Sequence, residues 1–199
     1  MKNLLFATLV ALATCSCSKD NVKTDPVFQL PPETQTGANT FGVTIRGKVY
    51  IPRDPTGFNV GPSGKGAIYA GSSTYSWSEI RIIDGASPVG FKMIIHFKDL
   101  LSNTLATYSL MNSNFQEGLD SIDQNHIFFK IWDQNINNYA YYGSIENQGL
   151  VKITKRSGGI ISGSFSGKFV RYDNTNDFLT ISDGRFDLNL NTLPNHRFP

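Results

Sequence analysis

Cysteine is nearly absent from this chain, and its placement excludes two classes of small stabilised domain. The sequence has 199 residues and two cysteines, Cys15 and Cys17, both close to its beginning. Nothing after Cys17 can form a disulfide or bind zinc through a thiolate. A chain of this length is nevertheless long enough to form one domain that buries roughly two thirds of its surface.

The chain also lacks a strong excess of charge of either sign. It has 18 lysines and arginines against 16 aspartates and glutamates, which gives a formal net charge of +2. Proteins that bind nucleic acid through its phosphates carry a much larger positive excess. We therefore expect no nucleic-acid partner.

The apolar run near the start is too short for a permanent membrane span. It extends from Leu4 to Ala13, follows Lys2 and precedes small residues. Ten apolar residues rise about 15 Å as a helix, which is half the thickness of the hydrocarbon layer. A positive start, a short apolar core and small residues at the cut are typical of a secretory signal peptide, which we place at residues 1–16.

A cysteine at the expected cut indicates a lipoprotein. The peptidase that processes lipoproteins needs small residues just before a cysteine that already carries a diacylglycerol. Both Cys15 and Cys17 fit; we favour Cys17 because Ser16 immediately precedes it, and Cys15 is the alternative. Two or three acyl chains such as palmitate on one cysteine make attachment effectively permanent, since each buried methylene contributes about 0.8 kcal/mol. We expect a lipid-anchored protein of the cell envelope, at the outer membrane, facing the periplasm or the surface.

The mature chain divides into a tether and one domain. Residues 17–38 hold the lipidated cysteine and a polar segment with three prolines, which cannot bury enough apolar surface to order itself. From residue 39 to residue 199 the hydrophobic pattern repeats with a period of two, as in half-buried strands. The sequence therefore predicts a lipoprotein signal peptide at 1–16, a tether at 17–38 and an all-β domain at 39–199.

The domain is expected to consist almost entirely of β-strands. Turn residues such as Asp84-Gly85 and Ser157-Gly158-Gly159 separate them. The expected strands lie at 41–51, 67–72, 75–83, 89–97, 126–132, 139–145, 150–155, 160–172 and 178–190, with one short helix at most. This pattern predicts a single antiparallel β-sandwich or flattened β-barrel of about eight to ten strands. Whether the first and last strands pair decides between the two, and the sequence leaves this open.

The last expected strand contains an irregularity. Leu179 and Ile181 are apolar at odd positions, whereas Phe186 and Leu188 are apolar at even positions. A strand cannot change parity in this way without an inserted residue. We expect a β-bulge at Asp183-Gly184, because glycine accepts the left-handed conformation that such a bulge can require.

Motifs for nucleotide, metal or catalytic chemistry are incomplete. GPSGKG at 61–66 lacks the first glycine and the hydroxyl of a phosphate loop, and the run from Asp133 to Asn138 lacks the glycine and glutamate of a calcium loop. The three histidines share no metal-binding spacing, and GSFSG at 163–167 has phenylalanine where a nucleophilic serine belongs. We therefore assign no catalytic residue, metal, cofactor or nucleotide and expect a protein that is not an enzyme; a hydrolase is the second alternative.

Aromatic residues make up 12% of the chain and give the only candidate binding residues. Rings with one apolar face and polar neighbours are suited to glycan binding, although in β-proteins most such rings fill the core or cover cross-strand neighbours. The candidates are Tyr75, Trp77, Trp132, Tyr139 and Tyr141. We expect a non-catalytic binding or structural module, whose partner is a glycan or an envelope protein, with a glycan-binding accessory protein as the first alternative.

Four segments resemble a family of uncharacterised Bacteroidota lipoproteins, a domain of unknown function. They are LPPETQTGANTFG at 30–42, GKVYIP at 47–52, ISGSFSGKF at 161–169 and ISDGRFDL at 181–188. Together they extend over nearly all of the mature domain. The resemblance implies an exported, lipid-anchored β-domain, and it brings no catalytic or binding residues.

Overall fold

The structure is a computed structural model that describes residues 27–56, 65–72, 74, 76–101, 106–118 and 123–199. The expected signal peptide, both candidate lipidation residues Cys15 and Cys17, and the aromatic candidate Tyr75 lie outside the described residues. Within the described part of the chain, no helix is both long enough and apolar enough to cross a membrane.

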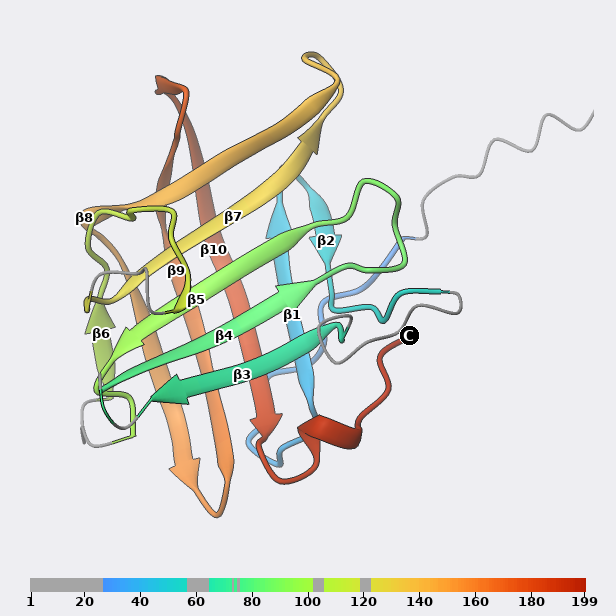
Figure 1. The fold of residues 1–199 in the computed structure, drawn as a ribbon, viewed down its shortest axis with the longest axis vertical. Helices are drawn as coiled ribbons and strands as arrows, with labels where there is room; N and C mark the ends of the chain where they lie inside the picture. The colour runs from blue at the N-terminus through green and yellow to red at the C-terminus, as the bar shows by residue number, and fades with distance from the viewer. Residues whose placement is uncertain (1–26, 57–64, 73, 75, 102–105, 119–122) are drawn as a thin grey trace, which may run out of the picture.

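The expected all-β fold is confirmed: ten strands form one antiparallel sheet (Figure 1). In the described residues the one named helical element is a 3-10 turn, η3 (Leu193–Asn195). The strands are β1 (Thr40–Ile45), β2 (Lys48–Tyr50), β3 (Ala67–Ser72), β4 (Trp77–Ile83), β5 (Lys92–Lys98), β6 (Thr107–Ser109), β7 (His126–Asp133), β8 (Asn138–Ser157), β9 (Ile160–Arg171) and β10 (Asn174–Asn189). Their order in the sheet is β2-β1-β10-β9-β8-β7-β5-β4-β3, and β6 pairs with β8.

The sheet folds over itself, so that β3, β4, β5 and β7 lie across β8, β9 and β10 (Figure 1). The first and last strands do pair, through Phe41 and Phe186, but the two edges of the sheet are β2 and β3. Because these edges do not pair with each other in the described residues, the sheet is not closed into a barrel.

The inner faces of the two halves enclose the core. The side chains of Phe41 and Phe165 stack with their ring centroids 5.8 Å apart, and the edge of one ring meets the face of the other between Phe129 and Phe169 at 5.2 Å. All four residues are almost completely buried. Burial of apolar surface of this kind is the main favourable contribution to folding.

The expected single strand at 41–51 is wrong, because the chain reverses in the middle of it. Arg46 and Gly47 have φ values of 51° and 75°, and they connect β1 to β2 as a two-residue hairpin. Such turns need positive φ at both central positions. The hairpin places Tyr50 opposite Val43, so Tyr50 faces the core side rather than the opposite face.

The expected β-bulge in the last strand is confirmed, but its physical reason is different. The register of β10 against β9 shifts between Ile181 and Gly184, and Ile181 and Phe186 are both buried. Gly184 is not among the glycines with positive φ. A Cβ atom there would lie 2.3 Å from the ring of Phe165, so close packing, rather than a left-handed backbone, requires glycine.

The two strands expected at 139–145 and 150–155 are one long strand, β8. Its register against β9 shifts between Ser144 and Gly149, where residues 145–148 bulge out opposite Lys168. Asn147 within this bulge has a φ of 59°, and its backbone N–H donates to the carbonyl of Leu110. The bulge therefore fixes the chain that follows β6 against the sheet.

The folded part of the chain begins before residue 39, which corrects the expected boundary of the tether. The side chains of Thr34 and Thr36 and the backbone N–H groups of Gly37 and Ala38 donate hydrogen bonds to the carboxylate of Asp187. The small number of apolar residues in this segment predicts a flexible tether, but polar groups hold the segment in place instead. We call residues 27–38 the strap.

Candidate functional site

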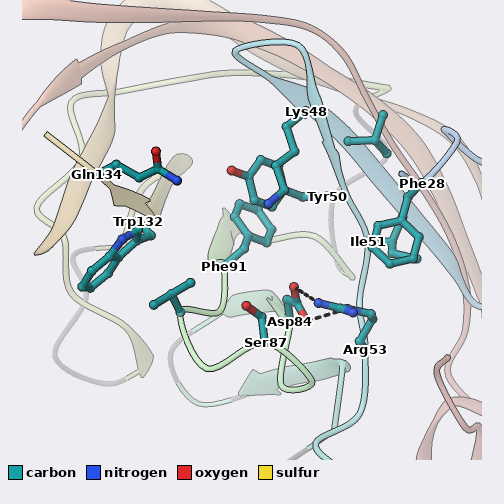
Figure 2. Close-up of a pocket in the computed structure, with 12 residues that line it drawn as sticks. Phe28, Lys48, Tyr50, Ile51, Arg53, Asp84, Ser87, Phe91, Trp132 and Gln134 are labelled. Carbon is teal, nitrogen blue, oxygen red and sulfur yellow. Dashed lines mark hydrogen bonds and ion pairs between the residues drawn. The ribbon is translucent and has the colours of Figure 1, made fainter. Parts of the chain in front are cut away.

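A pocket of about 190 Å³ opens beside the edge strand β2, and we take it as the candidate site because aromatic rings and a buried ion pair line it. We call it the β2 pocket (Figure 2). Its lining comes from the strap, from β2 and the residues after it, from the connection between β4 and β5, and from the hairpin between β7 and β8. The lining residues are Phe28, Lys48, Val49, Tyr50, Ile51, Arg53, Asp84, Ser87, Val89, Phe91, Trp132 and Gln134.

Aromatic rings form two sides of this pocket. The ring of Tyr50 packs on Phe91 with centroids 4.7 Å apart, and the ammonium group of Lys48 lies 5.5 Å from the centre of the Tyr50 ring. Figure 2 shows Trp132 on the opposite side from Tyr50 and Phe91, with Gln134 beside it. The hairpin at Arg46-Gly47 is what turns Tyr50 toward Phe91, and Trp132 enters from the end of β7.

An ion pair fixes the third side of the pocket. The guanidinium of Arg53 donates to both carboxylate oxygens of Asp84, from Nε at 2.7 Å and from Nη2 at 2.6 Å. Both side chains are largely buried, with 15% and 13% of their surface exposed. The backbones also pair: the N–H of Arg53 donates to the carbonyl of Ile83, and the N–H of Gly85 donates to the carbonyl of Arg53. This double connection joins the segment after β2 to the end of β4 and makes the pocket rigid.

The chemistry of the β2 pocket is that of a site for a small polar ligand with an apolar face. Tyr50 and Trp132 offer flat rings, and Ser87, Gln134 and Lys48 offer hydrogen-bonding groups. Most small-molecule pockets are lined predominantly by apolar side chains, whereas the β2 pocket exposes more polar than apolar surface, which suits a ligand rich in hydrogen-bonding groups. Among the described residues, no group of three or more His, Cys, Asp or Glu side chains is placed to hold a metal ion.

Three of the sequence-predicted aromatic residues gather at one end of β7 and β8. Trp132 and Tyr139 face each other across the two strands, and their rings meet edge to face at 5.4 Å. Tyr141 lies two residues further along β8, opposite Lys130 and on the same face of the sheet, and it is 42% exposed. Of the three, only Trp132 lines the β2 pocket.

The structure does not bring Trp77 to this group. Trp77 begins β4 at the opposite end of the sheet face, where its ring stacks on His96 with centroids 5.9 Å apart. It lines a different cavity, with Tyr69, Ser78 and Leu101 among its neighbours. The described aromatic candidates therefore lie at two separate places on the sheet and do not form one binding surface.

Sequence reasoning missed most of the β2 pocket, because it treated 41–51 as one strand. Tyr50 then belonged to the outward face, and nothing connected it to Phe91 or Arg53. The Arg46-Gly47 pair, which is followed by alternating residues, was the one pattern that could have indicated a hairpin.

A second polar cluster lies on the outer face of β4, β5 and β7. Glu79, His96 and His126 are direct neighbours across the three strands, and each is at most 1% exposed. The carboxylate of Glu79 accepts from Arg81 and from the backbone N–H of Gly118, whereas Nδ1 of His96 donates to the carbonyl of Gln124. The third histidine, His196, packs against Phe198 in the C-terminal segment.

Asp133, which opens the run that resembles a calcium loop, lies with Asp173 and Asp177 around an arginine. The guanidinium of Arg171 lies 3.3 Å from Asp133, 2.5 Å from Asp173 and 3.4 Å from Asp177. These bonds, with Asp173 first, raise the pKa of Arg171 further above its already high value, so its positive charge is permanent. Arg171 therefore takes the place that a cation would need among these carboxylates.

No known protein family, curated protein or solved structure matches the chain. The resemblance to Bacteroidota lipoproteins therefore stays a prediction, and the β2 pocket has to be interpreted from its own chemistry.

Proposed function

We propose that this protein is a non-catalytic binding module, held to the outer membrane of the cell envelope by a lipid on Cys17, with Cys15 as the alternative, and that its β2 pocket binds a saccharide. The observation that carries the proposal is the arrangement of Tyr50 on Phe91 opposite Trp132, with Gln134 beside Trp132 and with Ser87 and the Arg53–Asp84 pair on a third side (Figure 2). A sugar ring has one apolar face of C–H groups and a rim of hydroxyls, which this lining matches.

The Arg53–Asp84 ion pair supports recognition of hydroxyl groups in particular. The two side chains are already bonded to each other at 2.6 Å, so a ligand need not neutralise a buried charge. A carboxylate with free lone pairs accepts from a hydroxyl, and a guanidinium donates to one, so a fixed pair can serve neighbouring hydroxyls. The pair therefore favours a neutral polyol over a charged ligand.

The proposal is tested with the unlipidated chain from Ser18 onward on an array of envelope and host glycans, followed by calorimetry on the best ligand. We expect Trp132→Ala and Tyr50→Ala each to weaken binding by about tenfold or more, which corresponds to about 1.4 kcal/mol. Tyr141→Ala is the matched control, because this exposed tyrosine is on the same hairpin but does not line the pocket. Binding that responds to Tyr141→Ala and ignores Trp132→Ala would place the ligand elsewhere, and an array without any bound glycan would reject the saccharide.

A further inference from the structure

Two histidines are buried side by side on the outer face of the sheet, away from the β2 pocket. His96 in β5 and His126 in β7 are direct cross-strand neighbours, and their rings stack with centroids 4.9 Å apart. The stack continues through Trp77 on one side and Phe128 on the other. A histidine on the outer face of a sheet is normally in contact with water. Here, however, only 1% of the surface of His96 and none of the surface of His126 is exposed.

Described residues between β6 and β7 pack over this pair. We call residues 111–118 and 123–125 the cover; Figure 1 shows the segment over the beginning of β7. The ring of Phe115 in the cover packs against Phe128, with centroids 6.1 Å apart. The backbone N–H groups of Met111 and Ser113 donate to the carbonyls of Asn125 and Ser144, so the described ends of the cover are fixed to each other and to β8.

Both imidazoles bond to the backbone of the cover. Nδ1 of His96 donates to the carbonyl of Gln124 at 2.7 Å, and His126 forms backbone hydrogen bonds with Gln116 and Gln124. In the neutral tautomer that this bond selects, Nε2 of His96 carries no proton, and it has no hydrogen-bond partner among the described residues. A second proton on His96 would therefore be buried without an acceptor.

The charged groups around the pair also attach the cover to the sheet. Glu117 of the cover lies 2.6 Å from Lys92 and 3.3 Å from Arg81, and Asp123 lies 3.4 Å from Lys98. The charged groups on the elements packed around the two histidines are Glu79 and Arg81 on β4, Lys92 and Lys98 on β5, Lys130 on β7, and Glu117 and Asp123 on the cover. Glu79 is fully buried, and its negative charge is paired with the positive charge of Arg81 while Gly118 donates a backbone hydrogen bond to it.

We propose that His96 and His126 form an acid-sensitive latch: protonation of His126 releases the cover and exposes the two imidazoles and Phe128. Burial of two neutral, stacked imidazoles is tolerated, whereas an imidazolium in the same place is poorly solvated, and a positive charge on the neighbouring imidazole would disfavour it further. Release returns the charge to water. This site is separate from the β2 pocket and does not depend on the function proposed for it.

The direction of the pH effect follows from the same contacts. Burial, with a smaller contribution from His96, lowers the pKa of His126 to about 4 from its usual value near 6.5. A histidine that is harder to protonate when covered stabilises the covered state above pH 6.5 and loses that contribution as the pH falls toward 4. The equilibrium constant for opening then rises by about tenfold for each pH unit in this interval, since one proton is taken up on release.

Hydrogen exchange of the unlipidated chain from Ser18 onward tests the latch between pH 7 and 4.5, a range in which paired carboxylates stay ionised. The backbone N–H groups of Ser113 and Gly118 report on the cover, and that of Phe165 in β9 reports on the core. After correction for intrinsic exchange rates, we expect the protection of Ser113 and Gly118 to fall by more than tenfold while that of Phe165 is unchanged. Constant protection of the cover, or an equal loss in the core, would overturn the proposal.

Two variants separate the latch from general acid sensitivity. His126→Gln removes the titrating group and should flatten the pH dependence of Gly118 protection, whereas His196→Gln, in the C-terminal segment, should leave it as in the unaltered chain. If His126→Gln does not fold, the imidazole titration of the unaltered chain decides the question by nuclear magnetic resonance. A His126 imidazole that titrates near 4, together with cover opening, supports the latch; titration of His126 near its usual value of 6.5 rejects it.

Discussion

The side-chain hydroxyl of Thr34 donates a 2.6 Å hydrogen bond to the carboxylate of Asp187, although 153 residues separate the two in the chain. Asp187 is 1% exposed, and it also accepts from Ser162 in β9 and from the backbone of Thr36, Gly37 and Ala38. Burial alone would raise the pKa of this carboxyl, but the hydrogen bonds from Ser162, Thr34 and the strap hold it well below its usual range. One carboxylate therefore joins the strap to β10.

Replacing Asp187 with asparagine should release the strap. An uncharged amide cannot accept all of these bonds, and the loss of several charge-assisted bonds should lower the free energy of unfolding by about 3 kcal/mol at neutral pH. Because the folded-state pKa is depressed, the stabilisation by Asp187 is present above its ordinary pKa near 4 and is lost as the pH falls below it. Urea unfolding at pH 7 and pH 3 measures both effects.

The matched control for Asp187→Asn is Glu146→Gln, which makes the same chemical change at an exposed position. We expect Glu146→Gln to unfold like the unaltered chain at either pH. Equal stability of Asp187→Asn and the unaltered chain at pH 7 would show that the strap is not held by this carboxylate.

Gly184→Ala should destabilise the protein through steric overlap alone. The new methyl group would lie 2.3 Å from the Phe165 ring, which is buried and cannot move freely, so we expect a loss of about 1–3 kcal/mol in thermal or urea unfolding. The double variant Gly184→Ala with Phe165→Leu should be more stable than the sum of the single effects predicts, because the smaller side chain makes room. Additive effects would mean that the backbone, and not the ring, requires glycine.

The Arg53–Asp84 pair should be coupled much more strongly than an exposed pair. A double-mutant cycle with Arg53→Lys and Asp84→Asn should give a coupling energy of about 1–2 kcal/mol, since lysine cannot form the bidentate hydrogen bonds that arginine makes to the carboxylate. Lys98 and Asp123 are 51% and 47% exposed at 3.4 Å, and the same type of cycle there should give less than about 0.5 kcal/mol. The two cycles are measured by urea unfolding, and similar coupling energies would contradict the prediction.

Tyr142→Phe should reduce the amount by which the free energy of unfolding falls at high pH. The phenol of Tyr142 donates to Asp177 and accepts from Arg46; burial, and then the bond to Asp177, raises its pKa to about 12. Between pH 10 and 12 this tyrosine ionises in the unfolded chain before it does so in the folded protein, so its presence lowers stability as the pH rises. Urea unfolding at pH 9 and 11 should show a smaller decrease for Tyr142→Phe, and an unchanged decrease would refute the assignment.

Lipid attachment is predicted from the sequence and is tested in cells. Metabolic labelling with palmitate should mark the unaltered chain and should disappear when Cys15 and Cys17 are both replaced with alanine. Cys17→Ala alone should abolish it if Cys17 is the acylated residue, whereas loss on Cys15→Ala alone would favour the alternative. Labelling that persists in the double variant would exclude a lipoprotein.

The sequence by itself determined the fold class and the position of most strands. Alternation of apolar and polar residues is a local property, so the strands expected at 67–72, 126–132 and 160–172 agree with β3, β7 and β9 to within one residue, and the bulge before Phe186 could also be located without a structure. The aromatic candidate Trp132 could be named for the same reason, since its type and strand position are visible in the chain.

Only the tertiary structure decided which residues meet. The hairpin at Arg46-Gly47 turns Tyr50 toward Phe91, and the curl of the sheet brings Arg53 to Asp84, which makes the β2 pocket from segments that share no sequence pattern. Alternation along β5 puts His96 on the face opposite Met93, Ile95 and Phe97, but it does not show that a later segment covers that face. A period of two specifies the face on which a side chain lies, whereas burial depends on what packs there, and that is set by contacts between residues far apart in the chain.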